Sequence, residues 1–145
     1  MEKTTNSQGQ QPVAASKPLV QGVHCNYIPV ADVKQAKEWY MRVLGVTQVR
    51  PEGGIVVLGN GQWLFLIESK DRPNANFTTD DWNETKGFEM FSLTFATEDI
   101  VALHESLRQH GAEVEPIVDY GPCGLQFLFK DPDGNRFNVW QVDRA

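Results

Sequence analysis

The sequence has no long apolar run and no excess of positive charge, and each absence excludes a class of function. Its apolar stretches fall far short of the roughly 20 residues that a membrane-spanning helix needs. Thirteen basic residues against 19 acidic ones give a net charge of −6, which disfavours nucleic acid or an anionic membrane as a partner. The opening MEKTTNSQGQ lacks the apolar core of a signal peptide. We therefore expect a soluble, cytoplasmic protein that binds neither membrane nor nucleic acid.

Cysteine is scarce, and the common catalytic motifs are missing. Cys25 and Cys123 allow at most one disulfide, and in a reducing compartment we expect two free thiols. The chain contains no Gly-x-Gly-x-x-Gly, P-loop, Cys-x-x-Cys, His-Glu-x-x-His or Gly-x-Ser-x-Gly motif. No local signature of nucleotide binding, thiol redox chemistry or hydrolysis is therefore present.

Aromatic residues, by contrast, are plentiful, with eight Phe, three Tyr and four Trp among 145 residues. With 41% hydrophobic and 22% charged residues, the composition is that of an ordinary globular chain long enough for one domain. Residues 1–17 are rich in Gln, Thr, Ser and Lys and are expected to form a disordered tail. Residues 18–145 then make up the single domain.

The first half of this domain, about residues 19–69, has the pattern of a strand, a helix and three further strands. Asp32 is a suitable helix N-cap, and Gly45 ends the apolar helical stripe that follows it. Pro29 near the end of the first strand indicates an edge position or the exit of the strand, and Asn60-Gly61 predicts a tight hairpin. The predicted strands are residues 19–30, 46–50, 55–58 and 62–68.

The second half, about residues 87–142, repeats this order after a polar linker at residues 70–86. YIPVADV, which starts at Tyr27, matches TFATEDI, which starts at Thr94, at an offset of 67 residues. Asp99 therefore caps the second helix as Asp32 caps the first. The predicted strands are residues 88–96, 113–118, 125–130 and 136–141. Two βαβββ modules result, and neither is long enough to bury its sheet alone.

Three features of the sequence are typical of one protein family. These are the paired modules, WYMRVLGV at the end of the first helix and DPDGNRFNVWQ at the end of the second half. In these features the sequence resembles the vicinal oxygen chelate superfamily. This family includes glyoxalase I, bleomycin-resistance proteins and extradiol dioxygenases. The resemblance covers about residues 19–141. It implies an α+β fold in which two tandem modules form a curled mixed sheet around a cavity, with the helices outside. It implies no single reaction, because the family includes enzymes as well as drug-sequestering proteins without catalysis.

The resemblance also locates the positions that hold the metal in metal-dependent relatives. Those relatives use four inward-facing ligands, usually His and Glu, around a divalent ion that chelates substrate oxygens. The matching positions in this chain are Cys25, Ser92 and Asn138, with either Phe65 or Glu68 as the fourth. The first three are not usual ligands of a hard divalent ion, and a catalytic ion needs about three protein ligands. The resemblance therefore implies a site without metal or other cofactor.

Two questions of facing remain open in the sequence. Matching the turn glycines places Phe65 in the cavity, whereas matching the strand ends places Glu68 there, and the difference of three residues reverses the facing. His24 lies one residue before Cys25 and points to the helix side unless a bulge turns it inward. A metal-dependent member of the family, a glyoxalase-like lyase or isomerase or a dioxygenase with Ni, Zn, Fe or Mn, would need both His24 and Glu68 inside.

Without a metal, the cavity would be lined by neutral polar and aromatic side chains, placed by the alternation of residues along the strands. The predicted ligand-binding residues are Cys25, Tyr27, Trp63, Phe65, Ser92, Thr94, Arg136, Asn138 and Trp140. Such a pocket suits a planar, largely apolar ligand held by stacking and a few hydrogen bonds, to which Arg136 would add a cation or a carboxylate contact. We expect a small-molecule binding protein without chemistry, and the alternative is that these aromatics only fill the sheet as core.

The remaining expectations concern the helices and the oligomeric state. Trp39 and Tyr40 on the first helix are assigned to the core, and His104 and His110 on the second helix to the surface. Open sheet edges favour a homodimer. The linker is long enough for the two modules to pair within one chain or to exchange between two chains.

Overall fold

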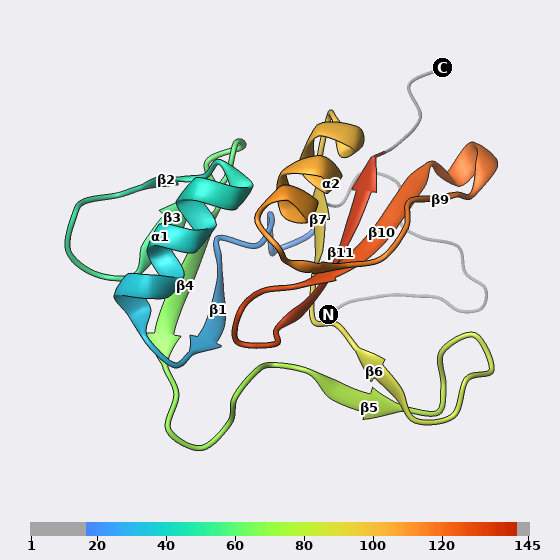
Figure 1. Cartoon of the computed structure of the whole chain (residues 1–145), viewed down its shortest axis with the longest axis horizontal. Helices are drawn as coiled ribbons and strands as arrows, with labels where there is room; N and C mark the ends of the chain where they lie inside the picture. The colour runs from blue at the N-terminus through green and yellow to red at the C-terminus, as the bar shows by residue number, and fades with distance from the viewer. Residues whose placement is uncertain (1–16, 142–145) are drawn as a thin grey trace.

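The computed structural model describes residues 17–141, so nearly all of the predicted tail, residues 1–17, lies outside the described residues. The chain has an α+β fold of two modules, each with a strand, a helix and further strands in that order (Figure 1). The first module comprises β1 (Cys25–Val30), α1 (Val33–Leu44), β2 (Thr47–Gln48), β3 (Ile55–Val57) and β4 (Trp63–Glu68). The second comprises β7 (Thr94–Ala96), α2 (Ile100–Gln109), β8 (Glu113–Val114), β9 (Val118–Asp119), the short 3₁₀ helix η1 (Gly121–Cys123), β10 (Leu125–Lys130) and β11 (Arg136–Gln141).

Each module contains one sheet, and the two sheets share one plan. The first has the strand order β1-β4-β3-β2, and the second has β7-β11-β10-β8 with β9 also paired to β10. In both sheets the first strand runs parallel to the last strand of its module. The internal repeat seen in the sequence is thus a structural repeat, and Pro29 lies in an edge strand as predicted.

The helix signals in the sequence are confirmed at both helices. The Asp32 carboxylate accepts a hydrogen bond of 2.9 Å from the backbone N–H of Gln35, and Asp99 accepts one of 3.0 Å from Ala102. Gly45 ends α1 with φ of 75°, a left-handed conformation that glycine adopts without a Cβ penalty. No helix within residues 17–141 is long and apolar enough to cross a membrane.

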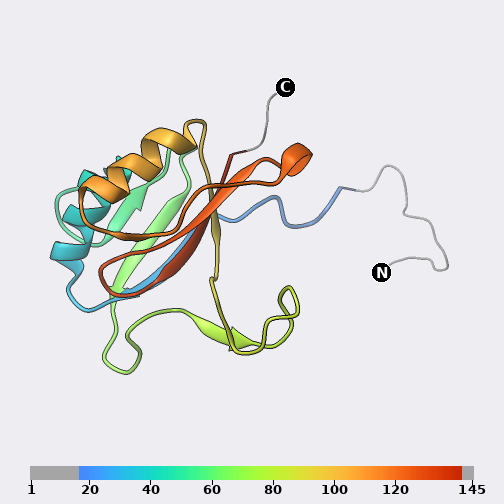
Figure 2. The ribbon, with the colours of Figure 1, turned by 45° about the vertical axis from the view of Figure 1, so that its right-hand side comes forward.

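The helices lie side by side and cover the same side of the molecule (Figure 2). Under α1 are the even-numbered residues of β1 and β4, such as Ile28 and Leu64, each 1% exposed. Under α2 are apolar residues of β10 and β11, including Phe137 and Val139. Trp39 and Tyr40 belong to this core, as predicted. The opposite faces of both sheets stay open, and the sheets do not close into a barrel.

A buried polar network joins the two modules. The Tyr40 hydroxyl on α1 donates a hydrogen bond of 2.6 Å to the Asp131 carboxylate in the turn before β11. Asn135 in the same turn donates to Asp131 and to the backbone oxygen of Pro29 on β1. Burial raises the pKa of the Asp131 carboxyl, and burial and the neighbouring carboxylate raise the pKa of Tyr40 well above its ordinary value. This network holds β1 beside the turn of the second module.

Several predicted strand boundaries are wrong, for identifiable reasons. The first strand begins at Cys25 instead of residue 19, because its partner β4 begins at Trp63, opposite Cys25. Pro116, which has no N–H, falls between β8 and β9, where one strand was predicted.

Between the modules lies a hairpin of β5 (Phe77–Thr79) and β6 (Phe88–Met90), which falls partly within the predicted linker. It extends away from the helices (Figure 1). The single strand predicted at residues 88–96 is therefore two strands. Because β6 pairs with β5 and β7 pairs with β11, the chain changes partner between them and bends at Ser92.

Candidate functional site

The open face of the first sheet is mainly apolar and carries an aromatic stack. Tyr27 on β1 lies opposite Phe65 on β4, with ring centroids 5.8 Å apart and planes inclined by 29°. Tyr27 is 65% exposed, so the stack faces outward. We call this surface the aromatic face; the residues aligned on it by strand register are Cys25, Tyr27, Ile55, Val57, Trp63, Phe65 and Ile67.

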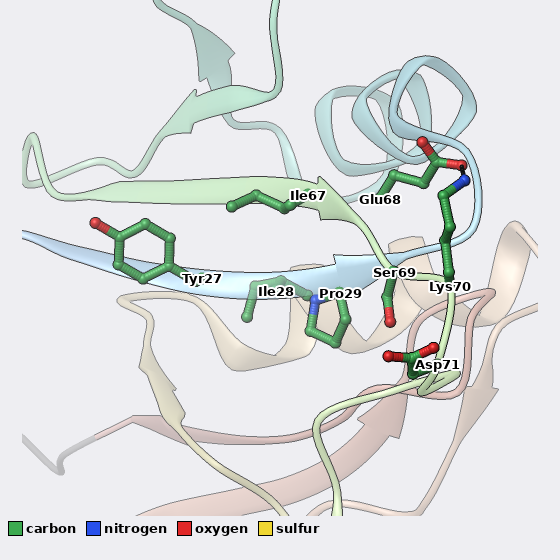
Figure 3. A pocket seen from close by; sticks show the side chains of 8 residues that line it. All are labelled: Tyr27, Ile28, Pro29, Ile67, Glu68, Ser69, Lys70 and Asp71. Atoms are coloured by element: carbon green, nitrogen blue, oxygen red, sulfur yellow. Dashed lines mark hydrogen bonds and ion pairs between the residues drawn. The ribbon is translucent and has the colours of Figure 1, made fainter.

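The buried residues that alternate along β4 show which side of the sheet Phe65 and Glu68 face. Leu64 and Leu66 are each 1% exposed in the core under α1, so Phe65 points to the open side. Glu68 lies in the other row, at the end of β4, and its carboxylate is 3.4 Å from the Lys70 ammonium. Figure 3 shows this pair turned away from Tyr27. The register obtained from the turn glycines is therefore the correct one.

His24 and Glu68 lie at opposite ends of the β1–β4 pair. His24 precedes β1 and is exposed, with its ring centroid 5.1 Å from that of Trp63. Glu68 pairs with Val30 at the other end. A separation of six strand positions corresponds to roughly 20 Å, so the two side chains do not converge on one ion.

The open face of the second sheet carries a hydrogen-bonded group of neutral polar side chains. The Asn138 amide nitrogen donates to Gln126 Oε1 at 2.9 Å and to Thr94 Oγ1 at 3.4 Å. Asn138 is only 8% exposed. We call Thr94, Gln126 and Asn138 the amide cluster.

Two larger side chains lie on either side of Asn138 along β11. Trp140 is 40% exposed, and its indole N–H donates to the backbone oxygen of Cys123. Arg136 donates to the backbone oxygen of Glu89 at 2.6 Å and to the Glu115 carboxylate at 3.0 Å. The Arg136 guanidinium, which was predicted to contact a ligand, is therefore hydrogen-bonded to groups of the protein itself.

Arg136 forms part of the anchor of the β5–β6 hairpin. Its guanidinium carbon lies 4.9 Å from the ring centroid of Phe88 on β6. The carboxylate of Glu89 is 3.0 Å from the Lys130 ammonium, and it also accepts a hydrogen bond of 2.6 Å from Asn76. Hydrogen bonding to Lys130 and Asn76 and the nearby charges lower the pKa of Glu89. The hairpin is thus held against the second sheet by charged and polar contacts.

Other predicted site residues lie away from these two faces or have limited polar roles. Ser92 is exposed in the bend between β6 and β7. The Cys25 thiol contacts its neighbour's backbone oxygen, Asn26 O, at 3.5 Å, and both cysteines are free. His104 on α2 and His110, the residue that follows α2, bond backbone oxygens of Glu115 and Ser106 and do not approach either open sheet face.

A shallow pocket of about 570 Å³ opens at the end of β1 and β4. Its lining includes Tyr27 from the predicted site, with charged residues from the start of the linker (Figure 3). The lining residues are Tyr27, Ile28, Pro29, Ile67, Glu68, Ser69, Lys70 and Asp71. The volume is within the range of small-molecule sites, which is roughly 300–1,000 Å³. The pocket extends the aromatic face toward a polar rim.

The residues at the family's metal positions do not fit a divalent ion. Phe65 offers no donor atom, and Ser92 lies in the exposed bend between β6 and β7. Among residues 17–141, no three His, Cys, Asp or Glu side chains gather closely enough to hold a metal ion.

Gln126 belongs to the amide cluster but is not among the residues predicted from the sequence. Phe127 and Phe129 are buried in β10, so alternation places Gln126 on the open side. The DPDGN turn sets Lys130 opposite Arg136 and Gln126 opposite Trp140. Gln126 is thereby a diagonal neighbour of Asn138. Both signals were present in the sequence.

Three solved structures illustrate the similarity of the fold. TnmS3, an antibiotic binding protein from Streptomyces sp. CB03234, is 22% identical with a TM-score of 0.64, over 88% of this chain and 100% of that one. A glyoxylase/bleomycin resistance protein/dioxygenase domain from Frankia sp. EAN1pec is 25% identical with a TM-score of 0.64, over 88% and 96%. A glyoxalase/bleomycin resistance protein from the same Streptomyces strain is 22% identical with a TM-score of 0.60, over 83% and 100%.

Comparison with curated proteins finds no match. The family model of the Glyoxalase/Bleomycin resistance protein/Dioxygenase superfamily matches residues 22–139, which include both sheets, both helices and the hairpin between the modules. The chain therefore belongs to the glyoxalase/bleomycin resistance protein/dioxygenase superfamily.

Proposed function

We propose that this chain is a small-molecule binding protein that holds a planar, largely apolar ligand without a metal ion and without a chemical step. The observation that carries the proposal is the exposed stack of Tyr27 on Phe65, beside Trp63 on the open face of the first sheet. Aromatic side chains bind flat apolar molecules by offset stacking and by removing their surface from water. The antibiotic binding protein among the structural neighbours supports a ligand-holding role.

The second sheet would supply the polar contacts of this site. Asn138 and Thr94 offer hydrogen-bonding groups on a face that also presents the Trp140 ring. Ser92 lies in an exposed bend, and Arg136 holds the hairpin, so neither is included. The proposed ligand contacts are Cys25, Tyr27, Trp63, Phe65, Thr94, Asn138 and Trp140.

We further propose that the site is completed in a cytoplasmic homodimer. Tyr27, Ile67 and Trp140 are 65%, 41% and 40% exposed, and the two open faces belong to separate sheets. A second copy that laid its amide cluster over the aromatic face would enclose a ligand between them and bury these side chains. Sedimentation at micromolar concentration should give twice the 16.3 kDa mass of one chain. A particle of one chain's mass under these conditions would contradict the dimer.

Calorimetric titration with 5-methylphenanthridin-6-one, a planar tricyclic compound without an N–H donor, tests the binding role. With EDTA present, we expect a dissociation constant in the micromolar range, since one stacked ring system is worth about 8 kcal/mol at most. Tyr27→Ala and Phe65→Ala should each weaken binding about tenfold, which is the loss of one aromatic contact. Val101→Ala, at an exposed position on α2, is the matched control and should bind like the unaltered protein.

Two results would overturn this function. One is the absence of binding, or binding that both aromatic variants leave unchanged. The other is stoichiometric Ni, Zn, Fe or Mn in the purified protein that is lost when His24 and Glu68 are replaced, because that would indicate the metal-dependent enzyme of the family.

A further inference from the structure

The amide cluster combines burial with unused hydrogen-bonding capacity. Both side-chain hydrogen bonds that Asn138 forms within residues 17–141 use its amide nitrogen, and its Oδ1 accepts none there. The side chain is nevertheless only 8% exposed. A buried acceptor without a donor is unfavourable and is uncommon in folded proteins.

Gln126 has the complementary unused group. Its Oε1 accepts from Asn138, while its Nε2 has no acceptor among the described residues. Turning both amides over exchanges these roles, since Gln126 then donates to Asn138 and leaves its own oxygen open. In either arrangement the pair presents one acceptor and one donor to the open side of the sheet.

A structural role alone does not account for this arrangement. Gln126 and Asn138 are diagonal neighbours on two antiparallel strands, and one hydrogen bond between them would support the sheet. The buried position adds a cost, because the amide oxygen of Asn138 loses water without gaining a protein donor. A ligand that supplied the missing donor would remove that cost.

We infer that the amide cluster is the polar recognition element of the proposed site and that its ligand carries an adjacent N–H donor and carbonyl acceptor, as in a lactam or imide. Such an edge is planar and matches one donor and one acceptor held side by side, as two amides pair with each other. The inference rests on the proposed function. It adds Gln126 to the site and narrows the ligand from a planar apolar compound to one with a cis-amide edge.

The test compares phenanthridin-6(5H)-one with its N-methyl derivative, 5-methylphenanthridin-6-one. The two compounds share the ring system and the carbonyl, and only the first has the N–H. We expect the unaltered protein to bind the N–H compound about tenfold more tightly, which corresponds to one net hydrogen bond.

Asn138→Leu keeps the size of the side chain and removes the acceptor, and it should reduce this preference to less than about twofold. The ratio in this variant separates the lost hydrogen bond from the bulk of the added methyl group. Gln126→Leu removes the donor to the carbonyl that both compounds share, so it should weaken both of them; if the amides are turned over it removes the acceptor, and the preference falls instead. Unchanged binding of both compounds by this variant would contradict the inference, and this measurement carries the test if near-UV circular dichroism shows that the Asn138 variant does not fold. Tyr27→Ala should weaken both compounds by the same factor and leave the ratio unchanged.

Equal binding of both compounds by the unaltered protein, or a tenfold preference that survives in both variants, would overturn the inference and leave the proposed function standing. Binding of neither compound would overturn both.

Discussion

Removing the hydroxyl of Tyr40 tests most directly how much the buried network between the two modules contributes to stability. Tyr40 is fully buried, and its 2.6 Å bond to Asp131 joins α1 to the turn that begins β11. Hydrogen bonds to charged groups contribute about 1.5–3 kcal/mol, and no water can replace the donor at a buried site. We expect Tyr40→Phe to lower the free energy of unfolding by about 2 kcal/mol and the melting temperature by roughly 6–8 °C.

The pH dependence gives this prediction its sign. Burial raises the pKa of Asp131 above its ordinary value, while the bond from Tyr40 acts in the opposite direction. A carboxyl whose pKa is raised by folding contributes stability below its unfolded pKa and loses it as the pH rises through the folded value. Removing the hydroxyl raises the pKa of Asp131 further. The penalty of Tyr40→Phe should therefore be smaller near pH 4 than at pH 7.

Urea unfolding at both pH values measures the effect, with the denaturant slope m as a check on two-state behaviour. The control places Tyr40→Phe in an Asp131→Asn background, where the penalty should vary little with pH because the carboxyl that accepts from the hydroxyl is gone. A penalty below about 0.5 kcal/mol, which is typical of surface changes, or one that is equal at pH 4 and pH 7, would refute the reasoning.

Three further substitutions test other contacts. Gly54→Ala would bring a Cβ to 2.2 Å from the backbone oxygen of Leu66, and it should destabilise the fold by about 1–3 kcal/mol or more in urea unfolding; Gly22→Ala, which meets nothing within 4 Å, should not. Lys37→Met removes an ammonium that bonds the backbone oxygens at residues 50, 51 and 53 at 2.8–2.9 Å; a loss of about 2 kcal/mol is expected, and a loss near zero would contradict this role. Arg136→Ala should release the β5–β6 hairpin, seen as faster tryptic cleavage at Lys86, whereas unchanged cleavage would mean that the other anchors suffice.

Much of the fold was predictable because its signals are local. The bounds of β10 and β11 agree with the sequence prediction, since alternating residues flank the DPDGN turn. Asp32 and Gly45 mark the start and end of α1 as side-chain and backbone chemistry require. By contrast, β5 is only three residues long and polar in two of them. Its pairing depends on anchors such as Asn76 and Arg136, which lie far apart in the sequence.

The candidate site was predictable only in part. Alternation could not decide whether Phe65 faces outward, because the row with Leu64 and the row with Phe65 are both apolar. The structure decides it through the packing of α1 on one row. Tyr40 and Asp131 are 91 residues apart, so their network leaves no local signal. Arg136 was assigned to a ligand because its protein partners could not be seen in the sequence.

The central claim is that the aromatic face binds a planar ligand without a metal ion. Its most direct test is calorimetric titration of the EDTA-treated protein with 5-methylphenanthridin-6-one, followed by the same titration after adding Ni, Zn, Fe or Mn. The account predicts micromolar binding that is the same with and without metal and that is weakened about tenfold by Phe65→Ala. Binding that occurs only with a stoichiometric metal ion, or that does not depend on Phe65, would contradict it.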